Sequence, residues 1–294
     1  MFPPRRKFRL RLPERSLALG KHTLVMGILN VTPDSFSDGG RYLDTEAAVA
    51  RAIALEAAGA HIIDIGGEST RPGSAGISAD EEMRRILPVL QKLRGKIRIP
   101  ISVDTSKAEV AEAAAEMGAE ILNDVTGLRN DSRMADVARK RKLGLILMHM
   151  RGVPRTMQKT PFARNVIRDV TAGLRGSVAK ALKAGVAKSQ IVIDPGIGFG
   201  KSHEQNCEII QRLPDLAKLG VPLMLGTSRK SFLGTVLKRD GGSDRIWGTA
   251  ATVAATILQG AHIVRVHDVV EMAQVARVTD VLRSPELLRR SGAR

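Results

Sequence analysis

The most constraining feature of this sequence is a short apolar run that recurs eight times and carries a polar residue at or near its end. The runs are LVMGILN, HIIDIGG, IPISVDTS, AEILNDVTG, LGLILMHM, QIVIDPGIG, VPLMLGTS and AHIVRVHD. Their length and their content of Ile, Val and Leu predict eight strands that are buried on both faces.

Helical patterns lie between these runs. They cover residues 45–58, 78–94, 107–117, 132–142, 165–184, 203–219, 244–259 and 268–282. The phrases AAGAHIID, EMGAEILND and LQGAHIVRV each place Gly between a helix and a strand, which is typical of a left-handed C-cap.

The alternation predicts an α/β protein with a single-domain (β/α)8 TIM barrel over residues 21–285, and an open doubly wound sheet is the alternative. A basic N-terminal arm over residues 1–20 and a C-terminal tail over residues 286–294 flank this barrel.

The formal net charge of +16 favours acidic partners such as nucleic acid, an anionic membrane or a phosphorylated substrate. Much of the excess lies in two terminal runs, which we expect to be solvated. These runs contain Arg5, Arg6, Lys7, Arg9, Arg11 and Arg15, and Arg283, Arg289, Arg290 and Arg294. The sequence has no recognisable RNA-binding signature of combined basic and aromatic residues, so we expect no nucleic-acid partner.

The apolar runs are far shorter than the roughly 20 residues of a membrane span, and the basic N-terminus is not followed by an apolar signal segment. We therefore expect no membrane association and a cytoplasmic location. The single cysteine, Cys207, fits a reducing compartment, and its amphipathic surroundings predict that it packs on a helix.

Polar residues concentrate at the predicted strand ends, where barrel enzymes place their active sites. The set is Asp64, Asp104, Asn123, Asp194, Lys230, Arg265 and His267. Ordinary polar loops would explain any one of them, but a carboxylate within an apolar strand end is costly unless it is paired. Arg265 and His267 share one face of a strand and suit an oxygen-rich anion, although a structural pair of Arg265 with Asp268 is the alternative.

Glycine-rich segments follow two of the strands. PGIGFGKS is not a phosphate-binding P-loop, because Pro195 occupies the position of the first required Gly, and we expect its glycines to let the loop pass close to a ligand. In GTSRKSFLG, Lys230 falls in the first turn of a predicted helix, where its charge opposes the helix dipole, so we expect a functional partner for it. Two further loops, NVTPDSFSDGG and ESTRPGS, lie over adjacent strand ends and suggest a lid.

Eight segments in order resemble the dihydropteroate synthase family over residues 23–275. They are NVTPDSFSDGG, DIGGESTRPGS, ISVDTS, NDVTG, MHMRGVPRTMQ, DPGIGFGKS, GTSRKSFLG and GTAATVAATILQGAHIVRVHDV. The resemblance implies a transferase of folate biosynthesis, the target of sulfonamides. It joins 6-hydroxymethyl-7,8-dihydropterin diphosphate to p-aminobenzoate with Mg2+, and yields 7,8-dihydropteroate and pyrophosphate.

The resemblance also implies a role for each matching residue. By the resemblance, Asp104, Asn123 and Asp194 hold the pterin, Met148 packs on its face and Lys230 contacts a ring acceptor. The diphosphate lies against Arg265 and His267, and Asn30 binds Mg2+ with Thr70 in the same region. The residues that line the p-aminobenzoate pocket are Phe36, Thr70, Arg71, Pro72, Phe199 and Ser231. The catalytic set is Asp104, Lys230, Arg265 and His267. Members of the family are usually homodimers, which nominates the helices at 244–259 and 268–282.

We hypothesise a dissociative displacement in which pyrophosphate leaves before the arylamine attacks. Three other functions are alternatives: a methyltetrahydrofolate methyltransferase-type pterin-binding barrel, an inactive synthase-like paralogue, and a nucleic-acid-binding protein suggested by charge. The loops NVTPDSFSDGG and STRPGS argue against the methyltransferase.

Overall fold

The computed structural model of the chain describes residues 2–32, 40–69, 73–74, 76–153, 156–157, 163–239 and 241–290, and the side chains of residues 40–44 and 289–290 are not described. Phe36, Thr70, Arg71 and Pro72, to which the sequence assigns roles, lie outside the described residues. Most of the two proposed lid loops therefore also lies outside them.

All eight predicted strands form, and they build one parallel barrel. The strands are β3 (Leu24–Asn30), β4 (Ile62–Gly66), β5 (Ile101–Asp104), β6 (Ile121–Asp124), β7 (Gly144–Met148), β8 (Ile191–Asp194), β9 (Met224–Leu225) and β10 (Ile263–Val266). Their order is β8-β7-β6-β5-β4-β3-β10-β9, and a parallel bridge between Ile193 and Leu223 brings β8 beside the segment that enters β9. The (β/α)8 barrel prediction is confirmed.

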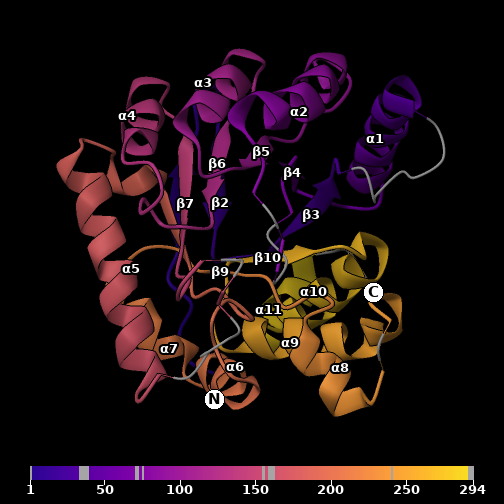
Figure 1. Ribbon diagram of the computed structural model, residues 1–294. Coiled ribbons are helices and arrows are strands. Elements are labelled where there is room, and N and C mark those ends of the chain that lie inside the picture. Colours follow the sequence, from indigo (N-terminus) through magenta and orange to yellow (C-terminus); the bar gives the residue numbers. More distant parts are fainter. Residues whose placement is uncertain are drawn as a thin grey trace.

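The helices surround the strands as an outer ring (Figure 1). They are α1 (Gly40–Ala57), α2 (Ala79–Leu93), α3 (Ala108–Glu116), α4 (Arg133–Lys140), α5 (Val166–Lys183), α6 (His203–Gln211), α7 (Leu213–Leu216), α8 (Ser231–Leu237), α9 (Ile246–Leu258), α10 (Val269–Arg283) and α11 (Glu286–Arg290). The helix predicted over 203–219 is instead divided into α6, α7 and a 3-10 turn, because Pro214 at the start of α7 has no backbone N–H to continue α6.

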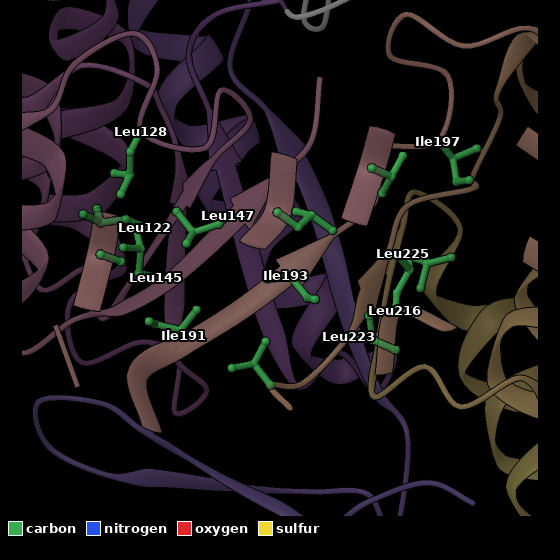
Figure 2. Close-up of a cluster of buried hydrophobic side chains, with 14 of the residues drawn as sticks. Leu122, Leu128, Leu145, Leu147, Ile191, Ile193, Ile197, Leu216, Leu223 and Leu225 are labelled. Carbon is green, nitrogen blue, oxygen red and sulfur yellow. The ribbon is translucent and has the colours of Figure 1, made fainter. Parts of the chain in front are cut away.

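The alternation of side chains along each strand creates two core layers. Outward-facing residues such as Leu145, Leu147 and Ile193 pack beneath the helices (Figure 2). Inward-facing residues toward the amino ends of the strands, among them Met26 and Ile146, fill the barrel interior. Most residues in the same phase at the carboxyl ends are polar, with Met148 on β7 as an apolar exception, so the interior becomes more polar toward those ends.

The N-terminal arm closes the amino end of the barrel. Its strands β1 (Phe8–Arg11) and β2 (Ser16–Leu19) pair as an antiparallel hairpin. Leu10, Leu12 and Leu19 join the interior core, which a tight barrel otherwise fills with strand side chains alone.

The expectation that both terminal basic runs are solvated is wrong for two arginines. Arg5 is buried, and its guanidinium donates to Thr23 Oγ1 at 2.7 Å and to Asp280 Oδ1 at 2.8 Å. Arg283 donates to the carbonyl of Leu258 at the end of α9 at 2.5 Å. Burial of these cations is compensated by a carboxylate in one case and by helix-terminal carbonyls in the other.

Cys207 lies on α6 as predicted, but it is exposed rather than packed, because the buried face of that helix carries Asn206, Ile209 and Ile210. None of the helices in the described part of the chain is long and apolar enough to cross a membrane.

Candidate active site

The polar strand-end residues meet at the carboxyl end of the barrel. The parallel register places Asn30 opposite Gly66, Gly66 opposite Asp104, and Asp104 opposite Asn123. Gly66 leaves room between its neighbours, because a Cβ there would lie 3.5 Å from Asp104 Cβ and 3.9 Å from Asn30 Oδ1. Asn30, Asp104 and Asn123 thus lie in a continuous row across β3, β4, β5 and β6.

Arg265 is the central cation at the carboxyl end of the barrel, which we call the mouth. Its Nε donates to Asp64 Oδ2 at 2.6 Å and its Nη2 donates to Asp104 Oδ2 at 2.8 Å. Burial alone would lower the pKa of Arg265, but the two carboxylates raise it above its ordinary value. The guanidinium therefore stays charged in a desolvated site. The alternative pairing of Arg265 with Asp268 is wrong, since Asp268 accepts from Arg229 Nε at 3.1 Å.

Asp104 and Asp194 are desolvated acceptors. Burial raises the pKa of Asp104 to about 7, against the opposing effect of Arg265 and with further raising by Asp64. Burial also raises the pKa of Asp194, whose Oδ1 accepts from the backbone N–H of Gly196 at 2.7 Å. Buried carboxylates of this kind favour ligands that bring their own N–H donors.

Asn123 presents an unpaired acceptor in the same mouth. Its Nδ2 donates to Asp64 Oδ2 at 3.0 Å, while its buried Oδ1 has no hydrogen-bond partner among the residues that the structure describes. A buried carbonyl oxygen without a partner costs free energy, so this atom is suited to accept an N–H from a bound molecule.

Lys230 and Phe199 form a second edge of the site. Lys230 Nζ lies 4.0 Å from the centre of the Phe199 ring, in a cation–π contact. Burial lowers the pKa of Lys230 to about 8, and Arg265 lowers it further while Asp194 and Asp104 oppose the shift. The prediction that Lys230 lies in the first turn of a helix is wrong by one residue: it is the N-cap of α8, and the exposed Ser231 is the first helical residue.

His267 is held by Ser228. The backbone N–H of His267 donates to Ser228 Oγ at 3.2 Å, and that hydroxyl lies 3.0 Å from His267 Nδ1. Burial, together with Arg265 and Arg229, lowers the pKa of His267 to about 3, so its imidazole is neutral near pH 7. Because the buried hydroxyl already accepts from the backbone, it can donate its own hydrogen to Nδ1, which leaves the ring hydrogen on Nε2.

Lys201 organises the glycine-rich loop, a role that the sequence did not indicate. Its buried amine donates to the carbonyls of His149 at 3.1 Å, Gly196 at 2.9 Å and Phe199 at 2.9 Å. Burial lowers the pKa of Lys201 to about 7. Gly196 has a φ of 70°, and a Cβ there would meet the His149 carbonyl oxygen at 2.0 Å. This glycine therefore allows close approach to a neighbouring loop.

Met148 lies in an apolar cluster at the mouth, which consists of Val125, Met148, Met150, Met157 and Phe199. Met148 and Asp194 are register partners on β7 and β8, so an apolar surface adjoins the carboxylate. This combination suits a flat heterocycle, whose face is apolar and whose edge carries N–H groups.

The start of the loop after β4 is anchored by ion pairs that the sequence did not predict. Lys107 Nζ contacts Glu68 and also Glu82, the latter at 2.5 Å. Arg85 Nη1 donates to the carbonyl of Gly67 at 2.9 Å. These contacts fix Gly67 and Glu68, the residue with which the segment ESTRPGS begins.

Asn30 lines a cavity of about 520 Å3 between β3 and α1, together with Arg51. The guanidinium of Arg51 reaches the backbone carbonyl of His267 at 3.5 Å. No cluster of three His, Cys, Asp or Glu side chains suited to a metal occurs within the described ranges. A single amide oxygen fits a Mg2+ that takes its other ligands from phosphate and water, because Mg2+ keeps several waters.

The assembled mouth thus has two chemical sides. Asp104, Asn123 and Asp194 can accept N–H groups, and Arg265, Lys230 and the His267 Nε2–H can donate to anionic or carbonyl oxygens. An N–H-rich ring that carries an anionic substituent satisfies both sides.

Comparison with known proteins agrees with this geometry. A profile of the family described as pterin binding enzyme matches residues 26–267. Dihydropteroate synthase of Synechocystis sp. is 48% identical over 263 residues, which cover 90% of this chain and 91% of that protein.

Two solved structures are similar over almost the whole chain. Dihydropteroate synthase from Clostridium difficile, in the presence of pteroic acid, has a TM-score of 0.85 and 46% identity, covering 90% of this chain and 98% of its own. The enzyme from Xanthomonas albilineans, with 4-aminobenzoic acid, has a TM-score of 0.88 and 39% identity, covering 95% and 99%. The resemblance in the sequence is confirmed, and the chain belongs to the dihydropteroate synthase family of pterin-binding transferases.

Proposed function

We propose that the chain condenses 6-hydroxymethyl-7,8-dihydropterin diphosphate with p-aminobenzoate to give 7,8-dihydropteroate and pyrophosphate, a step of folate biosynthesis. The observation that carries the proposal is one barrel mouth in which the desolvated acceptors Asp104, Asn123 and Asp194 face the cations Arg265 and Lys230. The similar proteins with pteroic acid and 4-aminobenzoic acid support the same substrates.

The pterin ring would occupy the inner part of the mouth. Its N–H edge would donate to Asp104, Asn123 and Asp194, and Met148 would pack against its face. Lys230 would donate to a ring acceptor. Each of these contacts gives a hydrogen-bond partner to a group that is already desolvated, which favours a bound heterocycle over an empty mouth.

The diphosphate would lie toward β10, against Arg265 and the neutral Nε2–H of His267. Because His267 has a pKa of about 3, it would donate a hydrogen bond without transferring its proton. Mg2+, held by Asn30 with phosphate oxygens and water, would neutralise charge on the leaving group.

The reaction would then proceed by dissociation. The bond between the methylene carbon and the diphosphate oxygen breaks, and its electron pair leaves with pyrophosphate. Asp104 stabilises the resulting cationic pterin methylene, and the arylamine nitrogen forms the new bond to carbon and loses one proton to water. Positioning and electrostatics supply this catalysis, and no side chain becomes covalently attached.

The p-aminobenzoate pocket would form beside Phe199, Lys230 and Ser231. Phe36, Thr70, Arg71 and Pro72 would complete it by the family pattern. We expect Phe36→Ala to raise the KM for p-aminobenzoate while leaving pterin binding unchanged. Initial rates at saturating pterin diphosphate measure this, and wild-type kinetics in the variant would remove Phe36 from the pocket.

We further propose that the chain forms a homodimer through α9 and α10, which pack side by side (Figure 1). Exposed apolar side chains occur on both helices: Val270, Val278 and Leu282 on α10, where the exposed Gln274 lies between the first two, and Trp247 on α9, which is 80% exposed. Exposed apolar side chains on two adjacent helices favour association with a second copy.

Pyrophosphate release tests the proposed function. The purified chain should release pyrophosphate at a sustained rate with both substrates and Mg2+, and the rate should fall when p-aminobenzoate or Mg2+ is withheld. Failure to release pyrophosphate under all conditions would exclude the activity. Covalently labelled enzyme after rapid quenching with labelled pterin diphosphate would contradict the dissociative route.

A further inference from the structure

We propose that Asp64 is a positioning residue, which orients the Asn123 amide toward the pterin and the Arg265 guanidinium toward the diphosphate through a single carboxylate oxygen. The inference rests on the proposed function and assigns a task to a residue that would not itself touch substrate. Asp64 lies on β4 with no exposed surface, one layer below Asp104.

The position of Asp64 allows it to connect two strands that are not its neighbours. It faces the barrel interior, and its strand pairs with β3 and β5 rather than with β6 or β10. Its Oδ2 nevertheless accepts from Asn123 Nδ2 on β6 at 3.0 Å and from Arg265 Nε on β10 at 2.6 Å. The carboxylate thus links opposite walls beneath the mouth.

The contact with Asn123 decides which end of the amide faces the ligand. A carboxylate only accepts hydrogen bonds, so it selects the nitrogen end of the amide and turns Oδ1 away. That oxygen is one of the buried polar atoms that have no hydrogen-bond partner in the described part of the chain. Without the carboxylate, the amide could rotate and present a donor to the N–H edge of the pterin.

The contact with Arg265 has a parallel effect on the anion side. Asp64 and Asp104 hold Nε and Nη2, which fixes the plane of the guanidinium and directs its remaining N–H groups away from both carboxylates. A guanidinium with two of its nitrogens already held loses less conformational freedom when its other N–H groups bind phosphate oxygens. Loss of Asp64 should therefore weaken the binding of both halves of the substrate, the pterin and the diphosphate.

Asp64→Leu, which has a similar volume and no acceptor, tests this inference. Calorimetry should show weaker binding of pterin diphosphate by about 10- to 100-fold, since each charge-assisted bond contributes appreciably. Ser102→Ala is the matched control, because Ser102 is the register partner of Asp64, is equally buried and has no hydrogen-bond partner within the described chain. The control should bind as wild type.

A double-mutant cycle separates positioning from general damage. If Asp64 acts through Asn123, adding Asp64→Leu to Asn123→Ala should weaken binding of the diphosphate-free pterin by less than twofold. Fully additive losses, or wild-type affinity in Asp64→Leu, would overturn the inference.

A neutron diffraction structure of the wild-type chain with pterin bound, which locates the amide deuterons directly, decides the case even if Asp64→Leu fails to fold. The inference requires Asn123 Oδ1 beside a pterin N–H and Asn123 Nδ2 on Asp64; the reversed amide would overturn it. The proposed function fails separately, if wild type forms no product or binds no pterin.

Discussion

The charge state of Lys230 gives a prediction at the scale of one residue. Burial lowers its pKa to about 8, so the amine is protonated below that pH and loses its proton above it. If the charged amine holds the substrates, kcat/KM for pterin diphosphate should fall as pH rises through about 8. In Lys230→Arg the maximal rate should drop but the alkaline fall should move to higher pH, because arginine keeps its proton.

The control for this prediction is Lys183→Arg, which changes an exposed lysine at the end of α5. Its pH profile should match that of wild type. An alkaline limb that stays in place in Lys230→Arg would assign the limb to another group or to the substrate.

Asp194 provides a second residue-scale prediction. It is a buried acceptor at the end of β8 and lies beside Met148, so its removal deprives the pterin edge of a carboxylate. We expect Asp194→Ala to weaken pterin binding by at least about 100-fold. Calorimetry with a diphosphate-free pterin measures this, with Asp136→Ala, which changes an exposed carboxylate on α4, as control. Retention of affinity in Asp194→Ala would contradict the placement of the ring.

At the scale of elements, Lys201 joins the loop after β7 to the loop after β8. Replacing it with Met removes three charge-assisted hydrogen bonds, although the carbonyls of Gly196 and Phe199 each keep a backbone N–H donor. We expect Lys201→Met to lower the free energy of unfolding by about 2–4 kcal/mol. The KM for p-aminobenzoate should rise as well, because Phe199 belongs to this loop.

Urea denaturation and initial-rate kinetics check both effects of Lys201→Met. Lys183→Met removes an exposed lysine and should change neither quantity. Wild-type stability in Lys201→Met would show that the loop is held by other contacts.

The elements that the sequence predicted share one property: their pattern repeats along a continuous segment. The Ile, Val and Leu content of runs such as LILM and IVID predicted the strands, whereas the inward orientation of Met148 and Asp194 follows from the register of the folded barrel. The sequence did not predict the two strands of the N-terminal hairpin, because their apolar residues are few and lie among arginines.

The missed contacts join residues that are distant in sequence. Ser228 and His267 are 39 positions apart, and Lys201 reaches a carbonyl 52 positions away. A lysine is usually exposed, so nothing local indicates that this one is buried. The sequence marks Asp64 as a carboxylate within an apolar strand, but its partners on β6 and β10 are distant in sequence and can be identified only from the folded barrel.

At the scale of the whole molecule, the exposed apolar side chains of α9 and α10 predict the assembly. Val278→Asp places a charge among those of α10, where it would be desolvated by a second copy. We expect wild type to sediment as a dimer and Val278→Asp as a monomer at micromolar concentration.

Leu182→Asp is the matched control, since Leu182 is an exposed apolar residue on α5, away from α9 and α10 (Figure 1). This variant should remain dimeric. A monomeric wild type, or a Val278→Asp variant that still forms dimers, would exclude this surface as the interface.

The central claim is that the barrel mouth makes 7,8-dihydropteroate. The most direct measurement is mass spectrometry of the product formed by the purified chain from 6-hydroxymethyl-7,8-dihydropterin diphosphate, p-aminobenzoate and Mg2+, compared with Asp104→Asn and Arg265→Met. The account predicts stoichiometric 7,8-dihydropteroate and pyrophosphate from wild type and a loss of at least about 100-fold in each variant. Absence of product from folded wild type, or undiminished product from either variant, would contradict it.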